Sequence, residues 1–207
     1  MSTPVIYLHG FASSPASKKA QYFLGRFGPD RFSIPDLVGE DFFGMTITSQ
    51  LRVLEGAAAG GPVDLMGSSM GGYLAALFAA ANPGLVRRLV LLAPAFDFTN
   101  RWAGALGGDT VRQWRETGRM AVFHYGWKRT VEVGYGLYED SLRYPPFPDV
   151  HQPALIFHGT RDNVIPHTLS REFARLHSQV ELHEVDSDHE LIDALELIWE
   201  HSEPFLR

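Results

Sequence analysis

Short, continuous apolar runs recur along this chain, and each is followed within two residues by glycine or proline. Runs of this length bounded by such breakers are typical of strands buried on both faces of a parallel sheet. Residues 32–35 predict a further short strand, and the alternating pattern of residues 180–185 predicts a strand at the sheet edge. The predicted strands lie at residues 5–8, 63–66, 87–92 and 154–157, of which 63–66 is interrupted by Asp64 and 87–92 begins with Arg87 and Arg88.

Between these runs, apolar residues recur at helical spacing. In residues 46–59, for example, Ile47, Leu51 and Leu54 fall on one face of a helix. Strands that alternate with helices form a parallel sheet covered on both faces and joined by right-handed crossovers. The pattern therefore predicts a three-layer α/β fold with about six mostly parallel strands. The predicted helices cover residues 15–27, 46–59, 70–81, 166–178 and 189–201.

Residues 97–150 interrupt this alternation, because they separate two predicted strands by far more than a crossover needs. A long insertion after the carboxyl end of a strand lies beside the active-site rim of such a fold. We therefore expect a core of residues 1–96 and 151–207 and a small helical cap of residues 97–150, within a single structural domain.

Aromatic residues are frequent in the predicted cap, and we expect some of them to line an acyl or aromatic pocket. The alternative is that each aromatic side chain only packs the insertion against the body. The candidates for lining the pocket are Phe11, Trp102, Trp114, Tyr125 and Trp127.

Composition narrows the class of protein. The 207 residues suffice for one α/β domain, and 45% hydrophobic and 20% charged residues are ordinary for a globular protein. A net charge of −6 argues against a nucleic-acid partner. The absence of cysteine excludes disulfides and a thiolate nucleophile. No apolar run is long enough to span a bilayer and no leader segment is evident, so we expect a cytoplasmic protein.

The run at residues 63–66 continues into G-x-S-x-G, formed by Gly67, Ser69 and Gly71, and then into a predicted helix. A serine at the apex of a strand–turn–helix connection has a strained backbone and an exposed hydroxyl, which is typical of a nucleophile. Ser68 does not fit this register, because methionines occupy the positions where glycines would be required. The alternative is a plain glycine-rich turn.

A serine nucleophile needs a base, and the base needs an acid that orients it. In this type of fold the acid and then the base follow the serine along the chain, each in a loop after a strand. Asp162 follows the strand at residues 154–157 and is the predicted acid. Its alternative role is to cap the helix that begins near residue 166, and Asp97 is the rival acid.

His189 is the predicted base, because it alone among nine histidines lies between the last strand and the last helix. His9 and His158 each precede a glycine at a strand end, where we expect them to shape loops by hydrogen bonds. No pair of histidines has a convincing metal-ligand context, so we predict no metal. The remaining histidines are interpreted as surface or packing residues: His124, His151, His167, His177, His183 and His201.

An acyl-transfer reaction also needs backbone donors for the oxyanion. We expect one from the amide of Met70, which follows the nucleophile at a helix N-terminus. The second is expected from the loop after the first strand, at the amide of Phe11.

Taken in order, these motifs resemble the α/β-hydrolase superfamily, and more narrowly the small YqiA-like esterases and the related mitochondrial depalmitoylase-type serine hydrolases. The resemblance implies hydrolysis of an acyl ester or thioester by Ser69, Asp162 and His189. It also implies that the first two strands of the full α/β-hydrolase sheet are absent, because the oxyanion loop follows the first strand. The motifs are Tyr7-Leu8-His9-Gly10-Phe11, Ser13-Ser14-Pro15, Ser17, Gly67-Ser68-Ser69-Met70-Gly71-Gly72-Tyr73, Gly159-Thr160-Arg161-Asp162 and Asp188-His189.

The expected function is therefore a cofactor-independent serine esterase or thioesterase that acts on a small-molecule substrate with an apolar acyl group. Two alternatives stay open. The same triad could run another chemistry, such as carbon–carbon bond hydrolysis, a lyase reaction or acyl transfer. Alternatively, the chain could be a non-catalytic binding module, although the complete Ser-Asp-His order argues against this.

Basic residues outnumber acidic ones over residues 101–129 of the predicted cap, where Asp109 and Glu116 are the acidic ones. One interpretation is that the cap favours an anionic leaving portion, such as that of a CoA thioester or a carboxylate-bearing ester. The other is a solvated helix face. The basic residues are Arg101, Arg112, Arg115, Arg119, Lys128 and Arg129.

Overall fold

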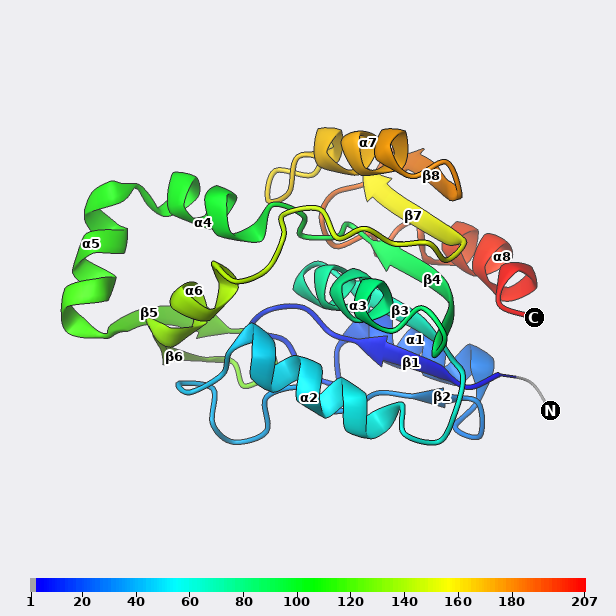
Figure 1. Ribbon diagram of the computed structural model, residues 1–207, viewed down its shortest axis with the longest axis horizontal. Coiled ribbons are helices and arrows are strands. Elements are labelled where there is room, and N and C mark those ends of the chain that lie inside the picture. The colour runs from blue at the N-terminus through cyan, green and yellow to red at the C-terminus, as the bar shows by residue number, and fades with distance from the viewer. Residues whose placement is uncertain (1–2) are drawn as a thin grey trace.

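The computed structural model describes residues 3–207, so the first two positions of the predicted core lie outside it. Its centre is a six-stranded parallel sheet in the order β2-β1-β3-β4-β7-β8 (Figure 1). This confirms the predicted α/β class, the number of strands and the edge position of the last strand. The strands are β1 (Val5–Leu8), β2 (Phe32–Ser33), β3 (Val63–Ser68), β4 (Val86–Leu92), β7 (Ala154–Gly159) and β8 (Val180–Val185).

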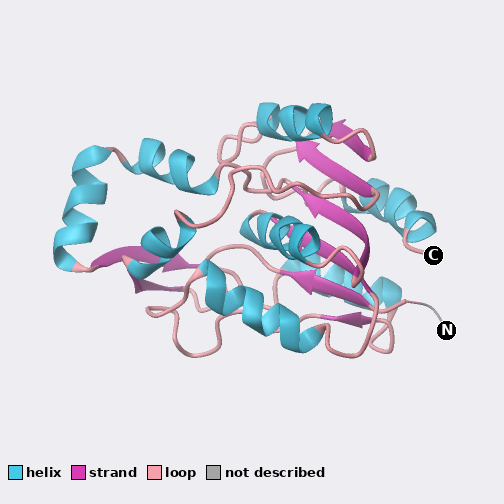
Figure 2. Cartoon of the chain, viewed as in Figure 1, coloured by secondary structure: helices cyan, strands magenta, loops and turns pink. Residues whose placement is uncertain are grey.

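Helices cover both faces of the sheet, as Figure 2 shows. Along β1, Ile6 and Leu8 pack into one apolar cluster, whereas Val5 and Tyr7 pack into the other. The first cluster includes side chains of α2, α3 and α7, and the second includes side chains of α1 and α8. Continuous apolar strands thus follow from burial on both faces. The five helices are α1 (Lys18–Phe27), α2 (Ile47–Ala57), α3 (Met70–Ala81), α7 (His167–Leu176) and α8 (Leu195–Phe205).

The parallel arrangement brings the carboxyl ends of the strands to one edge of the sheet. In Figure 1 the arrowheads of β1, β4 and β7 point toward the side where residues 97–150 extend from the sheet. The loops that follow β1, β3, β7 and β8 therefore meet at this edge, where α/β folds place their ligands.

Residues 97–150 form three helices, as expected for a helical cap, and also a two-stranded antiparallel sheet that was not predicted. Along β5 the exposed side chains of Ala121 and Phe123 alternate with the more buried Met120 and Val122. This period of two is the strand signal that the sequence analysis missed. The elements are α4 (Phe98–Leu106), α5 (Gly108–Thr117), β5 (Arg119–His124), β6 (Arg129–Gly134) and α6 (Gly136–Ser141).

The first and last helices also differ from the prediction by three residues or more, and the last helix ends at Phe205 rather than at residue 201. The last helix begins at Leu195 rather than at residue 189, because residues 189–194 form a loop in which Leu191 has a φ of 53°. Leu191 is nevertheless buried, so it contributes to the core from a loop and not from a helix face. The first helix begins at Lys18, with Ser17 at its N-cap, three residues later than predicted.

No helix within residues 3–207 has both the length and the apolar character needed to cross a membrane.

Candidate active site

Ser69 lies between β3 and α3 with φ 55° and ψ −119°, a region that residues other than glycine rarely occupy. The surrounding backbone holds this conformation. The Ser69 amide donates to the Leu92 carbonyl at 2.8 Å, and the Ala95 amide donates to the Ser69 carbonyl at 3.0 Å. Such over-determined strain is characteristic of the nucleophile elbow.

The two glycines that flank Ser69 are required by close backbone packing. A Cβ atom on Gly67 would lie 2.3 Å from the carbonyl oxygen of Gly71. A Cβ atom on Gly71 would lie 2.1 Å from the carbonyl oxygen of Leu8 on β1. The G-x-S-x-G pattern therefore reflects the absence of room for side chains where the turn packs against β1.

His189 lies in the loop after β8 and joins two other predicted site residues. Its Nε2 atom is 3.1 Å from Ser69 Oγ, and its Nδ1 atom is 2.7 Å from Asp162 Oδ2. A carboxylate only accepts, so Nδ1 carries a proton and Nε2 of the neutral ring accepts from the Ser69 hydroxyl. This arrangement lets the imidazole take the serine proton.

Asp162 follows β7, and its carboxylate is fully buried. Oδ1 accepts from the amides of Val164 and Ile165, both at 2.8 Å, while Oδ2 accepts from His189 and from His158 Nε2 at 3.1 Å. Burial alone would raise the pKa of Asp162. The hydrogen bonds from His158, His189 and Ile165 outweigh it and hold the pKa well below its ordinary value, so the carboxylate stays ionised.

The rival acid, Asp97, lies elsewhere. It is the N-cap residue of α4, with a left-handed φ of 53°, and its Oδ1 atom accepts from Asn100 Nδ2 at 2.6 Å. Its amide donates to the Pro146 carbonyl at 2.9 Å. The structure brings Asp162, not Asp97, into contact with His189.

The two remaining strand-end histidines make hydrogen bonds both to nearby loop residues and to other segments. His9 Nδ1 donates to the Gly10 carbonyl at 3.1 Å, and Nε2 accepts from the Leu37 amide at 3.4 Å. Burial lowers the pKa of His9, against the opposing influence of the Gly10 carbonyl and Asp36. His158 does more than the sequence analysis expected, because it contacts Asp162. Its spacing of four residues from Asp162 was the available signal.

The predicted oxyanion donors belong to two segments that meet at Ser69. Met70 is the first residue of α3, where an amide has no partner within the helix. Phe11 follows Gly10, whose added Cβ atom would be only 3.3 Å from Ser69 Cβ. The loop after β1 therefore packs directly against Ser69, with Ala12 in a left-handed conformation at φ 52°.

Among the predicted pocket residues, Trp102 contacts Phe11. The two rings meet edge to face with centroids 5.2 Å apart. Trp114 lies behind Trp102, also edge to face at 5.2 Å, and is buried, with its indole Nε1 donating to the Val133 carbonyl at 3.1 Å. Trp114 therefore packs against Trp102, and the Trp102 ring lies between Trp114 and Phe11.

Tyr125 and Trp127 lie in the turn between β5 and β6. The Tyr125 side chain is 72% exposed, while its amide donates to the Ala12 carbonyl at 2.8 Å. Trp127 stacks on His124 with centroids 4.1 Å apart. The turn thus contacts the loop after β1 mainly through its backbone.

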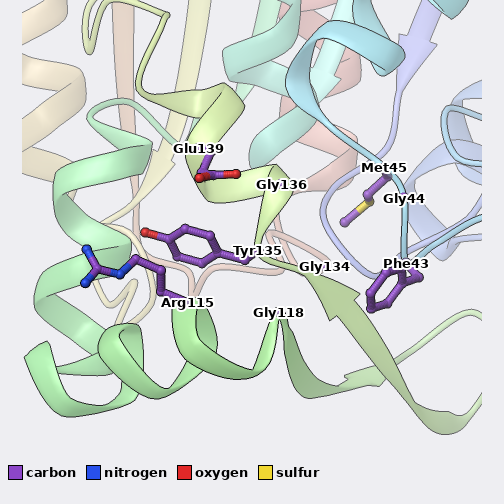
Figure 3. A pocket seen from close by; sticks show the side chains of 9 residues that line it. All are labelled: Phe43, Gly44, Met45, Arg115, Gly118, Gly134, Tyr135, Gly136 and Glu139. Atoms are coloured by element: carbon purple, nitrogen blue, oxygen red, sulfur yellow. The ribbon is translucent and has the colours of Figure 1, made fainter.

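Two cavities lie near the insertion. One of about 420 Å³ separates the loop of Phe43 and Met45 from Arg115, Tyr135 and Glu139, as Figure 3 shows. A second of about 410 Å³ lies against α2, the carboxyl-terminal part of α3 and residues 144–148. Neither cavity is lined by the Ser69–His189–Asp162 group.

Arg101 differs from the other basic residues of the insertion because it reaches the loop that carries Asp162. Its guanidinium donates to the Val164 carbonyl. Burial lowers the pKa of Arg101, against the opposing charges of Asp162 and Asp97. The others lie on the surface, where Arg112 pairs with Asp109 at 2.7 Å.

No group of three or more histidine, aspartate or glutamate side chains within residues 3–207 is arranged to hold a metal ion.

Comparisons with known proteins agree with this architecture. The model of a family described as "Uncharacterised protein family (UPF0227)" matches residues 4–203. No curated protein sequence matches the chain. Several solved structures do resemble it, and at identities below 25% they establish the α/β-hydrolase fold.

Three of these structures illustrate the likeness. Mouse alpha/beta hydrolase domain-containing protein 10 is 21% identical with a TM-score of 0.78, over 98% of this chain and 89% of that chain. A protein from Agrobacterium vitis S4 is 23% identical with a TM-score of 0.86, over 100% and 88%. Est1E from Butyrivibrio proteoclasticus, solved with ferulic acid, is 18% identical with a TM-score of 0.74, over 99% and 88%.

Proposed function

This chain belongs to the uncharacterised protein family UPF0227, and from that membership and the site geometry we propose that it is a serine hydrolase of carboxylic esters or thioesters. The observation that carries the proposal is the continuous hydrogen-bonded series from Ser69 through His189 to Asp162, with heavy-atom distances of 3.1 and 2.7 Å. These distances are within the range that nucleophile–base and base–acid pairs require.

In the proposed reaction, Ser69 Oγ attacks the carbonyl carbon of the substrate while His189 Nε2 takes the hydroxyl proton. The amides of Met70 and Phe11 donate to the oxyanion of the tetrahedral intermediate. His189 returns the proton to the departing alcohol or thiol, which leaves an acyl ester on Ser69. A water molecule then loses its proton to His189, attacks the acyl-enzyme, and the carboxylic acid leaves as Ser69 recovers its proton.

The aromatic contacts near the nucleophile favour an apolar acyl group. Phe11 carries one proposed oxyanion donor, and its ring packs against Trp102 and Phe42 with centroid distances of 5.2 and 5.6 Å. An acyl chain or aromatic acid that displaces water from these rings gains apolar contact. We therefore take residues 97–150 to be a cap that borders the acyl group of a small-molecule substrate.

A fluorophosphonate probe tests the nucleophile directly, because it modifies activated serines covalently. We expect one adduct on Ser69, located by mass spectrometry of the digested protein, and none on a folded Ser69→Ala variant. A folded wild-type protein that acquires no adduct on Ser69 would refute the proposal.

A substrate panel tests the reaction class. The panel comprises p-nitrophenyl esters and acyl-CoAs of graded chain length, together with a feruloyl ester, because Est1E was solved with ferulic acid. We expect turnover that saturates with substrate, and Ser69→Ala should lose about 10⁴-fold or more in kcat. A Ser69→Ala variant that retains a tenth of the wild-type rate would show that another residue is the nucleophile.

A further inference from the structure

A second histidine contacts the acid of the proposed triad. His158 lies on β7, and its side chain is fully buried. Its Nε2 atom is 3.1 Å from Asp162 Oδ2, the same oxygen that accepts from His189 Nδ1 at 2.7 Å. One carboxylate oxygen therefore lies between two imidazole rings.

The surroundings of His158 fix which ring nitrogen carries the proton. Nε2 lies near two pure acceptors, Asp162 Oδ2 at 3.1 Å and the Ile165 carbonyl at 3.0 Å, so it must be protonated. Nδ1 lies 2.7 Å from Ser170 Oγ on α7, and in the neutral ring it accepts the Ser170 hydroxyl proton. Ser170 thereby holds His158 in the tautomer that donates to Asp162.

His158 and two backbone amides together hold both oxygens of the Asp162 carboxylate in place. Oδ1 is held by the amides of Val164 and Ile165, which belong to the same loop as Asp162. Without His158, Oδ2 would keep His189 as its one side-chain donor among the residues described. Rotation of the carboxylate would then move His189 relative to Ser69.

We propose that His158 is a positioning residue for the proposed triad, because it fixes the Asp162 carboxylate in the orientation that aligns His189 with Ser69. This inference rests on the proposed function. His158 does not touch the reacting atoms and acts through Asp162. A purely structural role is the competing explanation, since His158 also links β7 to α7 through Ser170.

Two amide variants separate these roles. The side-chain nitrogen of His158→Gln can reach the position of the histidine Nε2 and donate to Asp162. The amide group of His158→Asn is one carbon shorter, so it lies near the position of Nδ1 and serves Ser170 but not Asp162. His158→Leu removes both hydrogen bonds. His177→Leu is a matched control, because His177 is also buried and donates from Nδ1 to a backbone carbonyl, that of Phe173, at 2.9 Å.

Steady-state kinetics with p-nitrophenyl butyrate provide the main measurement. We expect His158→Leu and His158→Asn to lower kcat about 10- to 100-fold with KM changed less than twofold, because small misplacements of catalytic groups have effects of this size. His158→Gln should recover most of the rate. His177→Leu should leave the kcat of the folded protein within about twofold of wild type, even if the variant is less stable.

The pH dependence of kcat/KM is a second measurement, and a purely structural role of His158 would leave it unchanged. Loss of the His158 donor makes the Asp162 carboxylate more basic, so Asp162 stabilises the His189 imidazolium more strongly. The acidic limb of kcat/KM should therefore shift to higher pH in His158→Leu and stay in place in His158→Gln. Other ionisable groups near these residues are Arg101 and Lys19, on which the charge of Asp162 acts, Asp188 and Glu190 on either side of His189, and His167, whose ring lies 6.4 Å from the His158 ring. They are unchanged in every variant.

Fluorophosphonate labelling distinguishes the two ways in which the inference could fail. If wild-type Ser69 is not labelled, the proposed function is wrong and the role of His158 falls with it. If wild-type Ser69 is labelled and His158→Leu is labelled at the same rate, only the role of His158 is wrong. Equal kcat values for folded His158→Gln and His158→Asn would also overturn it, and this comparison holds even if His158→Leu does not fold.

Discussion

The central sheet and the 97–150 insertion bury their strands differently. Every residue of β3 and of β7 is buried, whereas exposed and less exposed residues alternate along most of β5 in the insertion. A strand covered on both faces is determined by its own apolar sequence, but a strand covered on one face depends on what packs against that face. These strands of the sheet are therefore predictable from their own sequence, whereas the strands of the insertion depend more on their contacts with the core.

These contacts fall on the loops that carry the site. Trp102 packs on Phe11, the Tyr125 amide donates to the Ala12 carbonyl, and Arg101 donates to the Val164 carbonyl. The insertion therefore touches both the proposed oxyanion loop and the loop of the acid. The difference between the regions leads to a simple expectation: changes in the core should abolish chemistry, and changes in the insertion should alter substrate choice.

The largest expected effect lies at Asp162. Asp162→Asn should lower kcat about 10⁴-fold, because an amide that donates to His189 favours the wrong tautomer of the base. Initial rates of p-nitrophenyl ester hydrolysis measure this loss of kcat, and circular dichroism checks that the variant is folded. A folded variant with a kcat within tenfold of wild type would mean that Asp162 does not orient the base.

Alanine substitutions at two glycines test how the stability of the protein depends on each region. In the core, the new Cβ atom of Gly71→Ala would lie 2.1 Å from a backbone oxygen, and we expect a loss of about 3 kcal/mol or more. In the insertion, nothing lies within 4 Å of a Cβ atom on Gly104, inside α4, so Gly104→Ala should stabilise by about 0.5–1 kcal/mol. Urea unfolding measures both, and the comparison fails if the two variants are equally stable.

A pH-dependent effect should follow from the lowered pKa of Asp162. A carboxylate whose folded-state pKa lies below its unfolded value of about 3.9 stabilises the fold above that pH. This contribution is lost as the pH falls below about 4 toward the folded-state value. The unfolding free energy of wild type relative to Asp162→Asn should therefore decline from pH 5 to pH 3. A difference that stays constant over this range would contradict the prediction.

In the insertion, Trp102→Ala should change selectivity more than chemistry. Removing the ring that packs on Phe11 should lower kcat/KM for a long acyl ester about tenfold relative to an acetyl ester, the size of one aromatic contact. Trp127→Ala is the control, since its ring stacks on His124. Equal losses for long and short esters would show that Trp102 does not border the acyl group.

The smallest effect is expected at Tyr125, whose side chain is 72% exposed. Tyr125→Ala keeps the backbone hydrogen bond to Ala12, so stability should change by less than about 0.5 kcal/mol and kcat/KM by less than about twofold. Thermal unfolding and the ester assay measure these quantities. A large loss of activity toward long acyl esters would instead place Tyr125 in the pocket, as the sequence analysis expected.

Much of the core could be predicted because its constraints are local. The turn at Ser69 needs glycines beside it wherever it packs on β1, and Asp162 and His189 must follow strands because parallel strands end at one edge. The structure of the insertion was harder to predict, because it depends on contacts with residues far away in the chain. The β5–β6 hairpin has modest alternation, and the 189–194 loop contains apolar residues at helical spacing that a helix would also explain.

The sequence by itself determined the alternation of strands and helices, the position of the strained serine and the residue types available for acid and base, because burial and backbone sterics act over a few neighbouring residues. The tertiary structure decided the partners: that Asp162 rather than Asp97 meets His189, that His158 shares its carboxylate, and that Trp102 rather than Tyr125 packs on Phe11. These choices join residues up to 91 positions apart in the chain, as with Phe11 and Trp102. The packing of the insertion against the sheet edge brings Trp102 to Phe11, and the parallel pairing of β7 with β8 brings Asp162 to His189.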